Sequence, residues 1–303
     1  EKTHRIVAIA KRLAEATGAD EATTLRAAEL SKCDLVSEMV LEFPELQGIA
    51  GAEYARHDDE PAAVAEAIEY HYYPRFAGDE LPPSPEATAV ALADRLDTLV
   101  GIFGIGEPPT GSKDPFALRR ASLAVIRMLI ALEKPLSLTE LLQGAFEQHT
   151  AELSPDTAEL VSQYILERLG NWYDDDGIHI SVVRAALAAG ATDLFDIDLR
   201  VRALNAFANT ETAEHLAAAN KRVANILAKA DNLDGTPADS SLFAHEAEHA
   251  LQGALSQVGS TLAPLLADRN YQSALDELAQ LRGPVDAFFD SVMVNSEDPA
   301  ERL

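Results

Sequence analysis

The 303-residue chain carries 50 Asp and Glu against 24 Lys and Arg, and its formal net charge of -26 argues against a general nucleic-acid-binding surface. Its single cysteine, Cys33, excludes a disulfide framework and predicts a reducing, cytoplasmic environment. No apolar run approaches the roughly 18–20 residues that a membrane-spanning helix needs, so we expect no membrane among its partners.

The composition favours an all-α fold. Ala, Leu and Glu dominate, aromatic residues make up only 6% of the chain, and runs of β-branched residues are short. A chain of this length holds two ordinary domains, each large enough to bury its own core. A helical stripe of Ile6, Ile9, Ala10 and Leu13 is already in progress at Glu1, which predicts that the chain is a fragment of something longer.

Helical periodicity and capping residues place the elements of the first part of the chain. Gly18 ends the first helix, Ser84-Pro85 begins a long one, and Ser137 forms a capping box with Glu140. We expect helices at residues 21–43, 44–54, 61–72, 85–103, 154–170 and 178–189, and others that begin at Pro115 and Ser137.

The best domain boundary is the stretch from Gly190 to Asp193, where a glycine stop is followed by a new helix cap. It divides the chain into a helical domain with a connector, residues 1–192, and a second helical domain, residues 193–303. In the second domain we expect helices at residues 194–208, 213–230, 242–267, 271–281 and 285–294.

The segment from Gly101 to Arg127, GIFGIGEPPTGSKDPFALRRASLAVIR, is locally basic in this acidic chain. Its cations are accompanied by only two acidic residues in the segment, Glu107 and Asp114. A Pro-Pro-Thr-Gly turn leads to Asp114, which is suited to cap a helix that has Pro115 at its first position. Two of the arginines lie about 20° apart on a helical wheel, opposite the apolar positions. The segment therefore predicts a phosphate-binding ridge of Lys113, Arg119, Arg120 and Arg127.

The expected helix at residues 213–230 offers a second basic face, and this face carries no acid. Lysine and arginine there would contact phosphates, and an asparagine, which has both a donor and an acceptor, can read a base edge. An ordinary solvated polar face is the alternative. The residues that share about 100° of arc are Lys221, Arg222, Asn225 and Lys229.

Four blocks of the sequence resemble one family, in that family's order. GIFGIGEPPTGSKDPFALRRA and the upstream AELSKCDLVSEMVLEFPELQGIAGAEYARHD closely resemble the β subunit of the bacterial two-subunit glycyl-tRNA synthetase. LAAANKRVANILAKAD, from Leu216, resembles the anticodon-binding region of that subunit, and YQSALDELAQLRGPVDAFFDSVMV, from Tyr271, agrees as well. The resemblance implies the C-terminal half of the subunit: a degenerate HD-domain-like helical array followed by a helical-bundle anticodon-binding domain.

The same resemblance implies part of a glycine–tRNA ligase whose chemistry takes place elsewhere. In that family the aminoacylation site, with ATP and glycine, lies in a separate α subunit, while the β subunit holds tRNA. We therefore expect tRNA(Gly) and the α subunit as partners in a hetero-oligomer. No catalytic residue and no cofactor are expected in this fragment, and ATP and Mg²⁺ are expected in the assembled enzyme. A purely structural or oligomerisation module is another class of function that the acidic surface allows.

The first domain also resembles HD-type metal-dependent phosphohydrolases. In such enzymes a histidine, a His-Asp pair and a distant aspartate hold divalent ions that lower the pKa of a bound water. Here Cys33 replaces the histidine of the pair, and a lone thiol beside one carboxylate is not a usual site for Mg²⁺ or Mn²⁺. We expect a scaffold that has lost this site, so no metal is predicted. The alternative function is a phosphohydrolase acting on a nucleotide or phosphoester, with His4, Asp34 and Asp94 as ligands. The degenerate positions are His4, Cys33, Asp34 and Asp94, with His57 and His71 between the last two.

Overall fold

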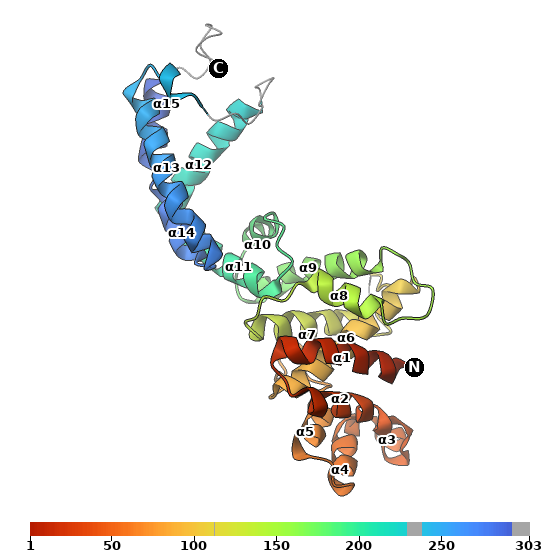
Figure 1. Cartoon of the computed structure of the whole chain (residues 1–303). Coiled ribbons are helices and arrows are strands. Elements are labelled where there is room, and N and C mark those ends of the chain that lie inside the picture. The colour runs from red at the N-terminus through yellow and green to blue at the C-terminus, as the bar shows by residue number, and fades with distance from the viewer. Residues whose placement is uncertain (112, 229–237, 293–303) are drawn as a thin grey trace. The chain divides into compact units, whose positions relative to one another are not determined.

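The computed structural model describes residues 1–111, 113–228 and 238–292. Apart from two isolated bridges, every regular element among these residues is helical, which confirms the all-α prediction (Figure 1). The chain divides into two compact units, residues 1–198 and 199–303, and the division falls inside helix α11 (Leu194–Ala208). The functional domain bounds of 1–192 and 193–303, and the HD-like description of the first domain, stay predictions.

The first unit holds twelve elements before α11 among its described residues. They are α1 (Lys2–Thr17), α2 (Glu21–Leu30), η1 (Cys33–Val36), α3 (Glu38–Glu42), η2 (Pro44–Leu46), α4 (Ile49–His57), α5 (Ala62–Tyr70), α6 (Pro85–Gly104), α7 (Leu118–Ala131), α8 (Leu138–Phe146), α9 (Thr157–Asp175) and α10 (Ile180–Leu187).

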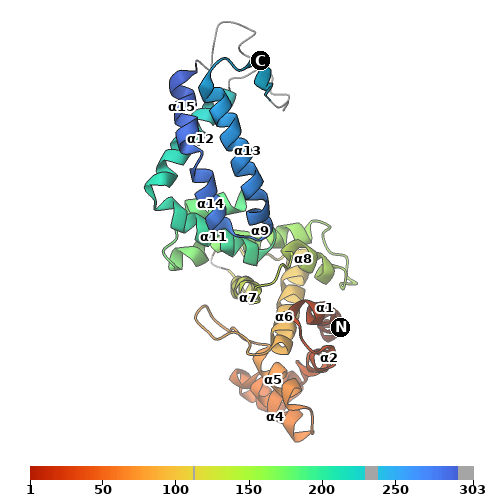
Figure 2. The same ribbon diagram turned by 60° about the vertical axis from the view of Figure 1, so that its left-hand side comes forward.

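Helix α6 is the centre of the first unit, where it packs against α1, α2, α5, α7, α8 and α9 (Figure 2). It begins as expected, because Ser84 accepts a hydrogen bond from the amide of Ala87 and Pro85 takes the first helical position. Residues 87–93 are all buried, because this part of the helix is covered by its neighbours on every side. The carboxylates of Asp94 and Asp97, which follow this run, therefore need nearby cations to compensate their burial.

The single helix expected at residues 21–43 is wrong, since the chain there forms α2, η1 and α3 in succession. The hydroxyl of Ser31 donates a hydrogen bond to the carbonyl of Ala28. The hydroxyl of Ser37 caps α3 by accepting a hydrogen bond from the amide of Val40. Between them, Asp34 is buried and accepts a hydrogen bond from the amide of Gly48 at 2.7 Å. This hydrogen bond to a residue 14 positions later interrupts the helix that the local sequence pattern predicted.

The end expected near Gly170 is also wrong, because α9 continues to Asp175. Gly170 is a packing residue rather than a stop. A Cβ atom at this position would lie 2.5 Å from the side chain of Ile180 at the start of α10. The glycine therefore allows α9 and α10 to approach closely.

The second unit contains α12 (Glu211–Leu227), η3 (Ser240–Leu242), α13 (Glu246–Ala267), α14 (Tyr271–Ala279) and α15 (Arg282–Ser291) among its described residues. Helix α13 packs against α14 and α15, and α12 packs against α14 and α15. The expected helix ends at Ala230 and Val294 lie outside the described residues. In the described part of the chain, no helix is long and apolar enough to cross a membrane.

Candidate nucleic-acid interface

The basic segment of the first unit is organised by the carboxylate of Asp114. Its two oxygens accept hydrogen bonds from the amides of Leu118 at 2.8 Å and Arg119 at 3.0 Å. Asp114 therefore caps α7, but the helix begins at Leu118 rather than at Pro115 as expected. The delay arises because Ala117 takes a left-handed conformation, with φ of 56°, directly before the first turn.

Two arginines of the predicted ridge are bound to their own chain. The guanidinium group of Arg119 donates to the carbonyl of Gly111. Arg127 donates to the carbonyl of Asp79 at 2.7 Å and to that of Phe76 at 3.4 Å. These contacts fix the turn before α7 and the loop between α5 and α6, so both side chains have a structural role.

The other two ridge cations are free. The side chains of Lys113 and Arg120 are exposed, and neither has a hydrogen-bonding or ionic partner among the residues that the structure describes. Arg120 also lines a cavity of about 560 Å³, together with Asp94 of α6 and Tyr72. The structure thus separates the ridge into two free cations and two anchored ones.

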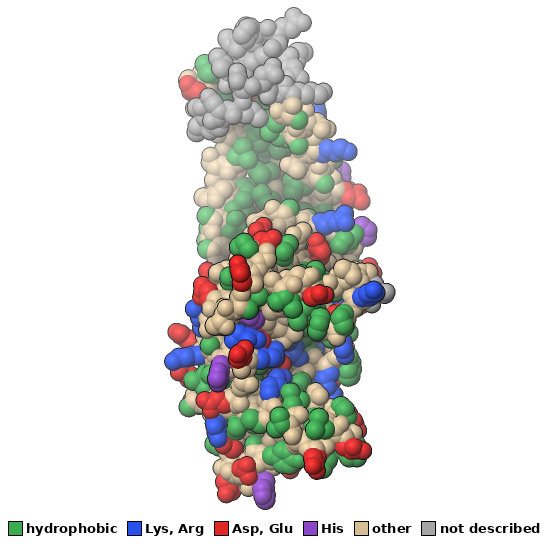
Figure 3. All heavy atoms as spheres, turned by 90° about the vertical axis from the view of Figure 1, so that its right-hand side faces the viewer, with side chains coloured by type: hydrophobic (Ala, Val, Ile, Leu, Met, Phe, Trp, Pro, Cys, Tyr) green, Lys and Arg blue, Asp and Glu red, His purple; other side chains and the backbone are tan. Residues whose placement is uncertain are grey.

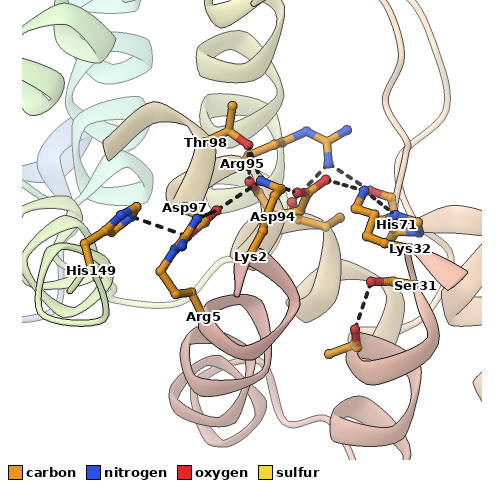
Figure 4. A network of polar contacts seen from close by, with 12 residues as sticks. Lys2, Arg5, Ser31, Lys32, His71, Asp94, Arg95, Asp97, Thr98 and His149 are labelled. Atoms are coloured by element: carbon orange, nitrogen blue, oxygen red, sulfur yellow. Dashed lines mark hydrogen bonds and ion pairs between the residues drawn. The ribbon is translucent and has the colours of Figure 1, made fainter. Parts of the chain in front are cut away.

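A buried charge network lies beside this cavity, centred on Asp94 (Figure 4). The ammonium groups of Lys2 and Lys32 approach its two oxygens at 2.9 and 2.8 Å. Burial by itself would raise the pKa of Asp94, but the two ammonium groups hold that pKa far below its usual range. Burial lowers the pKa of Lys32, and the facing Asp94 opposes that change. The carboxylate is therefore ionised and shared by two cations.

His71 completes the network on the far side of Lys32. Its Nδ1 lies 2.6 Å from the carbonyl of Ile68, and its Nε2 lies 2.8 Å from the ammonium of Lys32. The Nδ1 proton is donated to the carbonyl, so Nε2 accepts from the lysine. Burial, followed by the charge of Lys32, lowers the pKa of His71 to about 3. The ring is consequently neutral at physiological pH.

Asp97, one helical turn after Asp94, collects a second set of partners (Figure 4). The guanidinium of Arg5 binds it through Nε at 2.5 Å, and the ammonium of Lys2 lies 3.0 Å away. Nε2 of His149 lies 3.3 Å from the same carboxylate. The network therefore joins α1 and the segment after α8 to the central helix α6.

The residues at the degenerate HD positions do not fit a divalent ion. His4 and Cys33 are exposed, and Asp34 is engaged with the amide of Gly48. Asp94 and His71 do approach one point, but the ammonium of Lys32 occupies it. His57 is exposed at the end of α4. Among the described residues no three His, Cys, Asp or Glu side chains form a group that could hold a metal.

Sequence reasoning missed the role of Lys32 and Lys2. The one signal in the sequence is that Lys32 immediately precedes the Cys33-Asp34 pair. Its partners lie 39 and 62 residues away, a separation at which helical periodicity carries no information.

The predicted face of the second unit lies on α12. Lys221, Arg222 and Asn225 are all exposed there, as expected for one face of this helix. The guanidinium of Arg222 lies 4.2 Å from the ring centroid of Phe289 in α15, so part of it packs on an aromatic surface. Lys229 lies outside the described residues.

On the face of the molecule that Figure 3 shows, the acidic side chains are not gathered in one place. In the view of Figure 3, Asp and Glu side chains are scattered over the visible face, whereas a group of Lys and Arg side chains gathers in the middle of the unit of residues 1–198. A locally basic area in a chain of net charge -26 favours an anionic partner at that place.

Comparisons with known proteins agree over the whole length of this chain. The family model of the glycyl-tRNA synthetase beta subunit matches residues 1–188, and that of the DALR anticodon binding domain matches residues 216–303. The chain is 50% identical to the glycine–tRNA ligase beta subunit of Chromohalobacter salexigens, 49% to that of Pasteurella multocida and 48% to that of Haemophilus influenzae. Each match covers 100% of this chain and 44% of the relative.

The chain belongs to the glycyl-tRNA synthetase beta subunit family, since the family model matches more than half of it. This confirms the resemblance found in the sequence. The chain spans less than half the length of the curated relatives that it matches.

Proposed function

We propose that this chain is the tRNA-binding part of the beta subunit of a glycine–tRNA ligase. It positions tRNA(Gly) in the cytoplasm for ATP-dependent aminoacylation at the active site of a separate α subunit. The observation that carries the proposal is the match of residues 216–303 to an anticodon-binding domain, in which α12 exposes Lys221, Arg222 and Asn225. The relatives are named beta subunits of glycine–tRNA ligases, and this supports the proposal that the chain has a partner subunit.

The contribution of the chain is binding energy that holds the tRNA in place. In the assembled enzyme ATP and Mg²⁺ supply the activation of glycine at the α subunit. The free cations of the first unit, Lys113 and Arg120, contact backbone phosphates, because no clustered amides accompany them to read base edges. Arg119 binds the turn before α7, beside Lys113, and Arg127 binds α7, which carries Arg120, to the loop between α5 and α6.

The second unit carries the part of the surface that reads the anticodon. Lys221 supplies charge, and the amide of Asn225 supplies a donor and an acceptor for a base edge. Because the protein as a whole is strongly acidic, binding of RNA elsewhere on its surface is weak.

A phosphohydrolase function has no support in the geometry. Of its three expected ligands, His4 is exposed and Asp34 accepts a hydrogen bond from the amide of Gly48. Asp94 is the third, and its carboxylate and the nearby imidazole of His71 are both engaged by the ammonium of Lys32. A metal-bound water has no place between them.

A binding titration across salt concentrations tests the proposal, with tRNA(Gly) and a non-cognate tRNA as ligands of the chain in assembly with its α subunit. Arg120→Ala should weaken both complexes alike and reduce the log–log salt slope by roughly 0.7–0.9. Arg12→Ala is the matched control, because Arg12 is an exposed arginine that pairs with Glu147 elsewhere in the same unit. An Arg120 variant that keeps the affinity and the slope of the unmodified chain contradicts the phosphate contact.

A further inference from the structure

The cavity of about 560 Å³ beside Arg120 has the size of a small-ligand site. Its lining comes from the segment around η2, from the residues after α5, from α6 and from the start of α7. Three of the side chains that line the cavity are available to a ligand. Arg120 and Gln47 are exposed and have no polar partner among the described residues, and the ring of Phe116 is 47% exposed.

These three groups have complementary chemistry. A guanidinium binds phosphate, an aromatic face stacks on a base, and a side-chain amide donates and accepts at a base edge. Glu45 also lines the cavity, and it too has no partner in the described part of the chain. Its carboxylate accepts hydrogen bonds only, so it favours a base that carries an exocyclic amino group. Together the four side chains match a nucleotide rather than a simple anion.

The interior wall of the cavity tolerates a phosphate, although it includes a carboxylate. Asp94 is shared by the ammonium groups of Lys2 and Lys32, and Lys2 also contacts Asp97, which pairs with Arg5. Three cations therefore face two carboxylates, and the network keeps a net positive charge. Tyr72 is not available for stacking on the face that Lys32 covers, since the ammonium lies 4.0 Å from its ring centroid. Phe116 is therefore the stacking surface of the site.

Phe116 is held at the rim by the backbone. The carboxylate of Asp114 accepts hydrogen bonds from the amides of Leu118 and Arg119. Ala117, which directly precedes Leu118, is fixed at a φ of 56°. A left-handed conformation is costly for a residue with a Cβ atom, and it persists only where the surrounding contacts require it. The cap therefore fixes the backbone next to Phe116, which lines the same cavity as Arg120 and is partly exposed. An exposed aromatic ring and an arginine in one cavity are what a stacking site needs.

We propose that this cavity takes one unpaired nucleotide of the bound tRNA, with its base on Phe116 and a phosphate at Arg120. The base is adenine, cytosine or guanine rather than uracil, because only the first three carry an amino group for Glu45. The inference rests on the proposed function, which supplies the tRNA, and it adds a site that reads an unpaired base in the first unit.

The test uses the assembled enzyme and four probes: tRNA(Gly), short single strands of adenosine, cytidine or uridine, an RNA duplex without unpaired nucleotides, and free AMP or CMP. Phe116→Ala should weaken the tRNA and the adenosine and cytidine strands by about 5- to 150-fold, without changing the salt slope, because stacking releases no counterions. Phe116→Tyr should restore the affinity. Tyr54→Ala, which removes another exposed ring outside the cavity, should leave it unchanged.

The outcomes separate this inference from the proposed function. If tRNA binds with a slope that depends on Arg120 but Phe116→Ala has no effect, the nucleotide site is wrong and tRNA binding stands. If single strands bind through Phe116 while tRNA does not bind, the proposed function is wrong. Equal binding of the duplex, a preference for uridine strands, or binding of AMP or CMP through Phe116 without any binding of strands or tRNA through Phe116 also overturns an unpaired RNA nucleotide as the occupant.

Discussion

The ammonium group of Lys32 lies 2.8 Å from Nε2 of His71, so a charged lysine donates to a neutral histidine inside the first unit (Figure 4). The same ammonium lies 2.8 Å from a carboxylate oxygen of Asp94. A cation belonging to the chain itself therefore joins the segment after α2, the end of α5 and the central helix α6.

Removal of Lys32 should destabilise the first unit. In Lys32→Ala the ring of His71 loses its donor and Asp94 keeps only Lys2, so a buried charge and a buried acceptor lose a partner. We expect a loss of about 3 kcal/mol in the free energy of unfolding, measured by urea titration. Lys11→Ala is the control, because Lys11 is 63% exposed and faces Glu21 at 3.5 Å, and it should cost less than about 0.5 kcal/mol. Equal effects of the two substitutions would contradict a structural role for the internal cation.

The stability of this unit should fall as the pH is lowered from 7 to 5. The folded-state pKa of His71 is about 3, below its unfolded value of 6.5, so below pH 6.5 the unfolded chain binds a proton that the folded chain does not. The loss is roughly 1.4 kcal/mol per pH unit, or about 2 kcal/mol at pH 5. Asp94 acts in the same direction at lower pH, since its folded pKa is depressed and its stabilisation is lost only as the pH falls below 3.8.

A substitution isolates the histidine from the other titrating groups. His71→Gln keeps a hydrogen-bond acceptor near Lys32 but cannot titrate. Urea unfolding between pH 7 and pH 5 should show a slope that is flatter than that of the unmodified chain by up to one proton. The same slope in both proteins would mean that His71 is not the group responsible.

A histidine at position 33 should not create a metal site. The thiol of Cys33 is exposed and faces the carbonyl of Glu29 at 3.8 Å, while Lys32 fills the point between Asp94 and His71. Cys33→His should therefore bind no stoichiometric Mn²⁺ or Zn²⁺ and show no phosphoester turnover, as measured by metal analysis after gel filtration. One equivalent of retained metal would show that the ligands are still arranged for an ion.

Local features of the fold are predictable from the sequence, because they depend on residues a few positions apart. Gly18 ends α1 with a φ of 78°, and Ser84 and Ser137 cap α6 and α8 as expected. Asp114 also caps a helix as expected, although α7 starts three residues later than the sequence predicts. Each capping side chain lies within five residues of the backbone groups that it satisfies, and Gly18 acts through its own backbone amide, which donates to Ala14 and Glu15.

The interior of the candidate site is not predictable in this way, since it is built by contacts between distant segments. The shared face of Arg120 and Arg127 follows from the helical wheel, but a wheel does not show that Arg127 reaches the carbonyls of Phe76 and Asp79. Likewise, the burial of Asp34 against Gly48 ends a helix that its neighbours favour. Tertiary hydrogen bonds decide these positions over local propensity.

Substitutions on the exposed face of α12 should separate the contribution of charge from that of base reading. Lys221→Ala combined with Lys229→Ala should flatten the salt dependence of tRNA binding, because each lysine that no longer neutralises a phosphate lowers the log–log slope by roughly 0.7–0.9. Asn225→Ala should leave that slope nearly unchanged and reduce the preference for glycine anticodons by about 1–3 kcal/mol, the value of a bidentate base contact in DNA. Both effects are measured by titrating cognate and non-cognate tRNA at several salt concentrations.

Arg222 is left out of this charge test, because its guanidinium packs on Phe289 and its removal would also change the packing of α12 on α15. If the double lysine variant keeps the unmodified slope, the basic face of α12 is an ordinary solvated surface. If Asn225→Ala lowers the affinity for every tRNA equally, its amide contacts the backbone, and the anticodon is read by other residues of the second unit.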